Sequence, residues 1–94
     1  MAYFKFSGSD LYASSHKVAT IDGNKIYDEH HHQVATIKGN EIYDEHNHKV
    51  ATVKGTDIYD EHYSKIATMN DVKKSIDGAI GGTSIVGLWW FFVK

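Results

Sequence analysis

Apolar and polar residues alternate along much of the chain, and the alternation recurs in near-identical blocks. HKVATIDGNKIYDEHH is followed by HQVATIKGNEIYDEHN and then by HKVATVKGTDIYDEHY. These units occupy residues 16–31, 32–47 and 48–63, with a half unit at 64–69 and a shorter first unit at 1–15. The period is 16 residues without a gap, which predicts one small supersecondary unit used several times.

Each unit predicts a β-hairpin. Its Val-Ala-Thr-Ile stretch has high β-propensity, and the glycine that follows, with a polar residue after it, suits a two-residue turn of type II′. The turn glycines are Gly8, Gly23, Gly39 and Gly55. With the turn at residues 23–24, Asp22 faces Lys25, and the equivalent pairs of the next two units are also opposite in charge. Facing positions on neighbouring strands favour opposite charge, so these pairs support the register.

The same register assigns the two faces of the hairpin. One face holds Ala19, Ile21 and Ile26, and the other holds Val18, Thr20 and Tyr27. Both faces are partly apolar, so neither is a plain solvent face. We expect residues 1–69 to form a closed, roughly four-fold arrangement of antiparallel hairpins, because closure removes exposed sheet edges. The predicted fold is mainly β.

Residues 70–94 lose the alternation and predict one glycine-rich hydrophobic α-helix packed with the hairpins. Asn70 suits the N-cap and Asp71 the first turn, where the helix dipole favours negative charge. Small residues recur at every fourth position, a stripe that lets another backbone approach closely. They are Ser75, Ala79, Thr83 and Gly87.

Three environments fit this helix: the centre of the ring, a membrane interface, and a second copy of the helix in a homo-oligomer. Residues 78–93 give 16 uncharged positions, short of the ~20 that usually span a bilayer. We expect a central plug whose aromatic end enters a membrane interface, where tryptophan is favoured. The candidate residues for contact with lipid or another hydrophobic ligand are Ile85, Leu88, Trp89, Trp90, Phe91 and Phe92.

Composition narrows the function classes. A formal charge of −2 with seven neutral histidines does not favour nucleic-acid binding. The chain has no cysteine, so it has no disulfide or thiolate metal site, and its start does not resemble a secretory signal. Every candidate acid–base group occurs three times in the same setting, whereas catalysis usually needs one asymmetric site. We therefore expect no enzymatic activity and no cofactor, and a cytoplasmic location, either peripheral to the inner membrane or anchored at it.

The histidines fall at the seams between units, each close to an Asp-Glu pair. Histidine and carboxylate at this spacing can bind Zn²⁺ or Ni²⁺. The candidate metal ligands are His30, His32, His46, His48 and His62. The alternative is that exposed turns tolerate any polar residue and that duplication copied one histidine-bearing turn. Histidine ordinarily titrates near pH ~6.5, so mild acid would make this rim positive and favour anionic lipid.

Tandem VATIKGNEIYD units followed by a glycine-rich hydrophobic helix resemble the bacterial β-flower proteins, of the four-fold type. The resemblance covers essentially the whole chain and rests on the repeated G-N-x-I-Y-D and V-A-T-I stretches. It implies a shallow antiparallel barrel with radiating hairpins, similar to the C-terminal domain of tubby, and it suggests lipid association without an established activity.

We therefore expect a non-enzymatic module that associates with membrane lipid or another hydrophobic ligand. The alternative is a purely structural or protein-interaction domain with the helix as its internal plug. The sequence identifies no protein partner.

Overall fold

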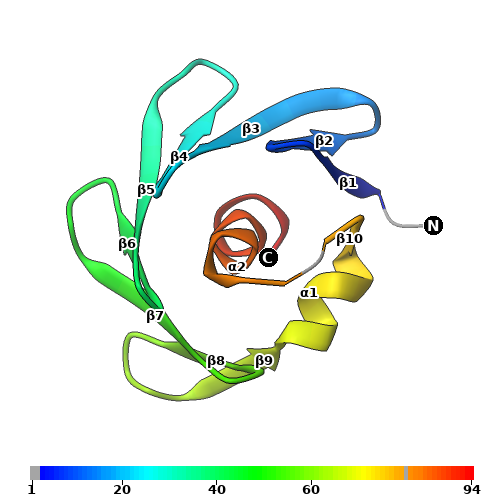
Figure 1. The fold of residues 1–94 in the computed structure, drawn as a ribbon. Helices are drawn as coiled ribbons and strands as arrows, with labels where there is room; N and C mark the ends of the chain where they lie inside the picture. Colours follow the sequence, from blue (N-terminus) through cyan, green and yellow to red (C-terminus); the bar gives the residue numbers. More distant parts are fainter. Residues whose placement is uncertain (1–2, 80) are drawn as a thin grey trace.

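The computed structural model describes residues 3–79 and 81–94, and it places the hairpins around a central helix (Figure 1). One sheet contains all ten strands in the order β10-β1-β2-β3-β4-β5-β6-β7-β8-β9. The strands are β1 (Phe4–Ser7), β2 (Asp10–Ala13), β3 (His16–Asp22), β4 (Lys25–Asp28), β5 (Gln33–Lys38), β6 (Glu41–Asp44), β7 (Lys49–Lys54), β8 (Asp57–Asp60), β9 (Lys65–Thr68) and β10 (Ile76–Asp77). The helices are α1 (Met69–Ser75), α2 (Thr83–Leu88) and the π-helix η1 (Trp89–Val93). Residues 1 and 2 of the expected first unit, and residue 80 of the expected helix, lie outside the described residues.

The predicted hairpin register is confirmed. Asp22 pairs with Lys25, and the next two pairs up the hairpin are Ile21 with Ile26 and Thr20 with Tyr27. The four turn glycines have φ angles of 60–66°, whereas the residues after them are not among those with positive φ, as a type II′ turn requires.

The inner face of the ring alternates large and small side chains. Cross-strand neighbours are Leu11 and Ala19, Ile26 and Ala35, Ile42 and Ala51, and Ile58 and Ala67. All eight are buried, with at most 9% of the surface of each exposed. An alanine opposite each large residue leaves room at the crowded centre of a closed ring.

Each pair of hairpins is joined across a register shift. Between β4 and β5, Ile26 pairs with Ala35 but Tyr27 pairs with Gln33, which leaves Val34 as an extra residue. The same irregularity recurs between β2 and β3, β6 and β7, and β8 and β9. A β-bulge bends the strand and increases its twist. The repeated bulges therefore curve the sheet into a ring.

The expectation of a single helix over residues 70–94 was wrong. The chain forms α1, then the short strand β10, and then α2 with η1. The break falls at Gly78, Gly81 and Gly82, whose φ angles of 84°, 100° and 100° are incompatible with a right-handed helix. At Gly78 a Cβ atom would also lie 2.5 Å from the carbonyl oxygen of Phe6. Only glycine therefore fits where the chain passes close to β1.

The start of α1 also differs from the expectation. Its N-cap is Thr68, two residues before Asn70. Asp71 is in the first turn, as predicted, and its carboxylate accepts a hydrogen bond of 2.8 Å from the Thr68 backbone N–H. The Thr68 side chain also contacts the backbone of Asp71, so the two residues form a capping box. This capping box explains why the helix starts where β9 ends.

A fifth unit completes the ring. β9, α1 and β10 fill the gap between the fourth hairpin and the first, with β10 pairing in parallel with β1 (Figure 1). The predicted closure is confirmed, but helix α1 stands where the repeat would have placed another strand. Four hairpins and this mixed unit give five positions around the axis, and not four.

The predicted central plug is α2 (Figure 1). Ile85, Val86 and Leu88 are buried in the common core, and Gly87 packs against Ile26 and Ile37 of the ring. The predicted stripe of small residues is not one helix face, because Ser75 belongs to α1 and Gly87 to α2. Gly87 instead allows α2 to pack closely against the ring of the same chain.

Candidate functional site

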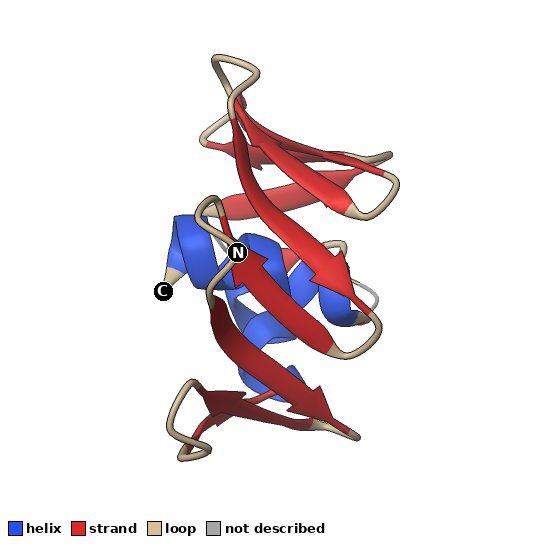
Figure 2. Cartoon of the chain, turned by 90° about the vertical axis from the view of Figure 1, so that its left-hand side faces the viewer, coloured by secondary structure: helices blue, strands red, loops and turns tan. Residues whose placement is uncertain are grey.

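One face of the ring brings together the predicted aromatic residues and the predicted histidines. Strand directions alternate, so the turns that follow the even-numbered strands lie on the side where β1 begins. Figure 2 shows the C-terminus projecting on that same side, with the other set of turns on the opposite side. We call this side the C-terminal face. It consists of residues 89–92 and three Asp-His turns, residues 28–32, 44–48 and 60–64.

Each Asp-His turn is built around its first carboxylate. In the first, Asp28 Oδ1 accepts backbone hydrogen bonds of 2.8 Å from His30 and 2.9 Å from His32. Asp44 and Asp60 repeat this arrangement in the next two turns. The pKa of each of these three carboxyl groups is lower than its ordinary value. The main cause is the hydrogen bond from the backbone N–H four residues later, which belongs to His32, His48 or Ser64.

The central residue of each Asp-His turn adopts a left-handed backbone conformation. These residues are His31, Asn47 and Tyr63, with φ angles of 64°, 65° and 61°. Histidine and asparagine are enriched in this conformation, but tyrosine is not. The sequence variation at this position therefore occurs within one fixed turn geometry.

The predicted metal ligands are all exposed, and the structure pairs four of them. The ring centroids of His30 and His32 lie 6.2 Å apart, and those of His46 and His48 lie 6.3 Å apart. His62 has Ser64 at the place of the second histidine. Within residues 3–79 and 81–94, no group of three or more His, Asp or Glu side chains is arranged to hold a metal ion.

The predicted lipid-contacting residues divide into two sets. Ile85 and Leu88 are buried in the ring, so they belong to the plug. The four aromatic residues 89–92 are only half-buried, on η1. Lys94 Nζ lies 4.4 Å from the ring centroid of Trp90, and its charge also helps lower the pKa of Asp60. This charge effect agrees with the position of the C-terminus on the face that carries the Asp-His turns (Figure 2). No helix among the described residues is long and apolar enough to cross a bilayer.

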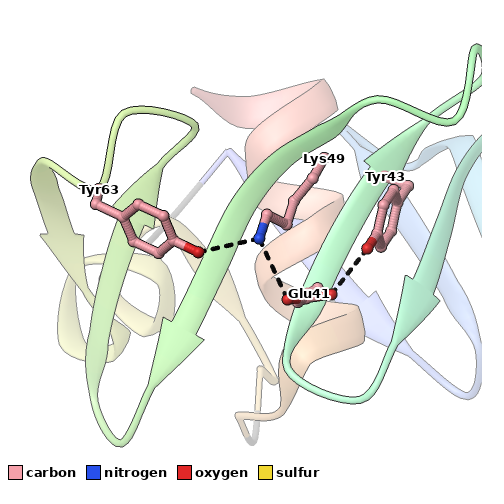
Figure 3. A network of polar contacts seen from close by, with 4 residues as sticks. All are labelled: Glu41, Tyr43, Lys49 and Tyr63. Atoms are coloured by element: carbon pink, nitrogen blue, oxygen red, sulfur yellow. Dashed lines mark hydrogen bonds and ion pairs between the residues drawn. The ribbon is translucent and has the colours of Figure 1, made fainter.

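A polar network that sequence reasoning missed links β6, β7 and the turn that follows β8 on the outer surface (Figure 3). Glu41 accepts a hydrogen bond of 2.8 Å from the Tyr43 hydroxyl and an ion-pair contact of 3.3 Å from Lys49. Lys49 also donates to the Tyr63 hydroxyl at 3.0 Å. The sequence did contain a signal for this ion pair, because an acidic residue and a lysine recur 16 positions later as Asp57 and Lys65. These two residues also form an ion pair, at 3.3 Å.

The network is suited to holding strands together and not to proton transfer. The hydrogen bond to Glu41 raises the pKa of Tyr43, and hydrogen bonds to Tyr63 and Glu41 raise the pKa of Lys49. Both groups therefore keep their protons at neutral pH. A general base needs the opposite shift.

A ring of hairpins closed around a hydrophobic helix defines the β-flower class of proteins. The chain matches the model of the 5-fold beta-flower protein family over residues 3–86, and it belongs to that family. The expected four-fold type is thus corrected, in agreement with the fifth unit formed by β9, α1 and β10. The comparisons with curated proteins and with solved structures gave no match.

Proposed function

We propose that the protein is a non-catalytic module that docks on the surface of a lipid bilayer through its C-terminal face. The observation that carries this proposal is the position of four consecutive aromatic residues. Residues 89–92 are half-buried at the end of the central helix, whereas the preceding residues 85–88 are fully packed in the core. Tryptophan and phenylalanine at such an end suit the interface between headgroups and acyl chains.

The surroundings of the aromatic residues support a docking role that depends on pH. At neutral pH the face carries the carboxylates of Asp28, Asp44 and Asp60, their Glu neighbours, the histidines of the turns and Lys94. Protonation of all seven histidines would take the formal charge of the chain from −2 to +5. Because anionic lipid attracts positive charge, binding should strengthen as the pH falls through the range in which histidine titrates.

The mode of lipid recognition is proposed to be interfacial and not headgroup-specific. A tubby-like barrel, which the family resemblance implied, would fit this use, but phosphoinositide binding of that type needs a lysine and arginine cluster. The chain has ten Lys and Arg residues in total and shows no such concentration in its sequence. A bacterial protein of this kind would act at the cytoplasmic surface of the inner membrane.

Vesicle flotation tests the proposal. We expect the full chain to float with phosphatidylcholine vesicles that contain phosphatidylglycerol, more at pH 5.5 than at pH 7.5, and Trp90→Ala to float several-fold less. Tyr27→Ala is the matched control, because Tyr27 is a half-buried aromatic residue on the face of β4 opposite the buried Ile26.

A second measurement needs no variant. If residues 89 and 90 enter the interface, brominated lipids will quench tryptophan fluorescence when vesicles are added. Absence of both flotation and quenching at either pH would refute the proposal.

The second candidate function is that of a structural or protein-interaction domain. The complete burial of Val86 and Leu88 favours it, because a helix so engaged cannot leave the ring without exposing the core. In that case, deletion of residues 83–94 should unfold the ring, and vesicles should bind neither the full chain nor the Trp90→Ala variant.

A further inference from the structure

We propose that two of the Asp-His turns each bind one late first-row divalent cation, such as Zn²⁺, through a pair of histidines. The pairs are His30 with His32 and His46 with His48. Imidazole nitrogen is a preferred ligand for Zn²⁺, Cu²⁺ and Ni²⁺. This proposal does not depend on lipid binding.

The geometry of the two pairs is the first support. Their ring centroids are 6.2 and 6.3 Å apart, with interplanar angles of 49° and 50°. A zinc–nitrogen bond of about 2.0–2.1 Å places the ion roughly 3 Å from each ring centroid, so two rings at a tetrahedral angle on one ion lie about 5 Å apart. The observed pairs are about 1 Å wider than this, so rotation of the exposed imidazoles toward each other would complete the chelate.

The backbone fixes this spacing independently of the central residue. His31 separates one pair and Asn47 the other, yet both turns have the same left-handed residue and the same two hydrogen bonds to the aspartate. The repeated geometry follows from the turn, which orders both histidine backbones before any ion arrives. A preorganised chelate loses less conformational entropy on binding.

A carboxylate stands behind the second histidine of each pair. Asp28 Oδ2 lies 3.9 Å from His32 Nδ1, and Asp44 Oδ2 lies 4.0 Å from His48 Nδ1. Histidine ligands usually direct one ring N–H to a carboxylate, which orients the other nitrogen to the metal and makes it more basic. At this separation the contact is not yet a hydrogen bond; if it shortens when the ion binds, Nε2 of His32 and of His48 would be the ligand atoms.

Each site would hold the ion with two protein ligands, and water would complete the coordination. No third His, Asp or Glu joins either pair among the described residues, and all four imidazoles are exposed. Such a site is open and exchanges its ion readily, unlike the closed four-ligand sites that stabilise a fold.

The chain contains its own controls. The third turn has His62 but carries Ser64 at the second position, so it should not chelate. His16 is held by Glu29, with Nε2 and Oε2 3.0 Å apart, and has no histidine two residues away. Two ions per chain are therefore expected, and not three or four.

Calorimetric titration of the untagged full chain with ZnCl₂ at pH 7.5, without lipid, tests the assignment. We expect a stoichiometry of two, falling to one in His32→Asn and to none in the double variant His32→Asn/His48→Asn. Ser64→His should raise it to three, and His16→Asn should leave it at two. Removing one histidine of a pair leaves a single imidazole ligand, so that turn should no longer chelate the ion.

Histidine ring resonances followed by NMR during the same titration locate the ion. Shifts confined to His30, His32, His46 and His48 would support the proposal. A stoichiometry unchanged in the double variant, an unchanged value in Ser64→His, or equal shifts at all seven histidines would overturn it. Failure of vesicle binding would have no bearing on this result, since no lipid is present.

Discussion

Replacing Gly87 by alanine puts a methyl group into the closest contact between the central helix and the ring. The new Cβ would lie 2.7 Å from Ile26 Cδ1 and 3.2 Å from Ile37 Cδ1. Ile26 is fully buried and Ile37 nearly so, which limits how far either can move. Added methyl groups in a packed core typically cost about 1–3 kcal/mol.

Helix propensity acts in the opposite direction. Glycine to alanine within a helix ordinarily stabilises by about 1 kcal/mol, and Gly87 has no positive φ to add strain. The two effects together predict a net loss of up to about 2 kcal/mol in the free energy of unfolding, or roughly 4–8 °C in Tm for each kcal/mol in a domain of this size. We therefore expect the cost of overpacking to exceed the gain in helix propensity, so that the variant is destabilised.

A double-mutant cycle separates the two effects. Ile26→Val removes the Cδ1 atom that blocks the new methyl group, at a cost of about 0.5–1.5 kcal/mol by itself. In the combined variant the alanine should cost about 1 kcal/mol less than it does alone, because the closer of its two contacts is gone while that with Ile37 remains. Urea unfolding followed by tryptophan fluorescence measures all four proteins. A stabilised Gly87→Ala variant with additive effects would refute the packing argument.

Three further predictions use the turns and the outer surface. Gly78→Ala should lower the free energy of unfolding by about 3 kcal/mol or more, and Gly39→Ala by about 1 kcal/mol. Both glycines have positive φ, but only at Gly78 would the new Cβ meet a backbone oxygen. Thermal unfolding of the two variants checks this order. The pKa of Asp44 is lowered on folding, so its contribution to stability is present above the unfolded value and is lost as the pH falls below about 4. Urea midpoints from pH 6 to pH 2.5 should therefore drop in the native chain and drop less in Asp44→Asn, and parallel curves would contradict this. Lys49→Met should change the free energy of unfolding by less than about 1 kcal/mol, since ion pairs in contact with solvent contribute little. A larger loss in urea unfolding would contradict this.

The repeats were predictable because each unit carries its own geometric information. The opposite charges of Asp22 and Lys25 indicated the register, and the glycine before each polar turn residue indicated the turn type. Both signals are local, and they recur with the 16-residue period. Prediction was most accurate where sequence neighbours are also spatial neighbours.

The fifth unit could not be predicted in the same way. β10 contains only two residues, and its partner β1 lies at the other end of the chain. The glycines near residue 80 were interpreted as close-packing positions in a helix, whereas Gly78, Gly81 and Gly82 break it through positive φ angles. Sequence alone does not distinguish these two uses of glycine, because the difference depends on a backbone that arrives from elsewhere.

The sequence predicted which residues belong to the candidate site, but it did not predict how they are arranged in space. The histidine turns and the aromatic residues were each identified, but nothing in the sequence placed them on one face. That placement depends on the direction in which α2 crosses the ring, and the left-handed glycines Gly78, Gly81 and Gly82 precede this helix. The paired spacing of His30 with His32 likewise depends on the left-handed conformation of His31.

The pairing of β10 with β1 has a consequence for cooperativity. Every other pairing in the sheet joins consecutive strands, so without this contact the hairpins would form a ribbon whose end units could fray one at a time. Phe4 and Lys5 pair with Ile76 and Asp77, and α1 connects β10 to β9, so the two ends of the ribbon are tied together through this unit. A contact of two residues on each strand is thus expected to couple the unfolding of these local units, and it can form only after residues 76–77 have been synthesised.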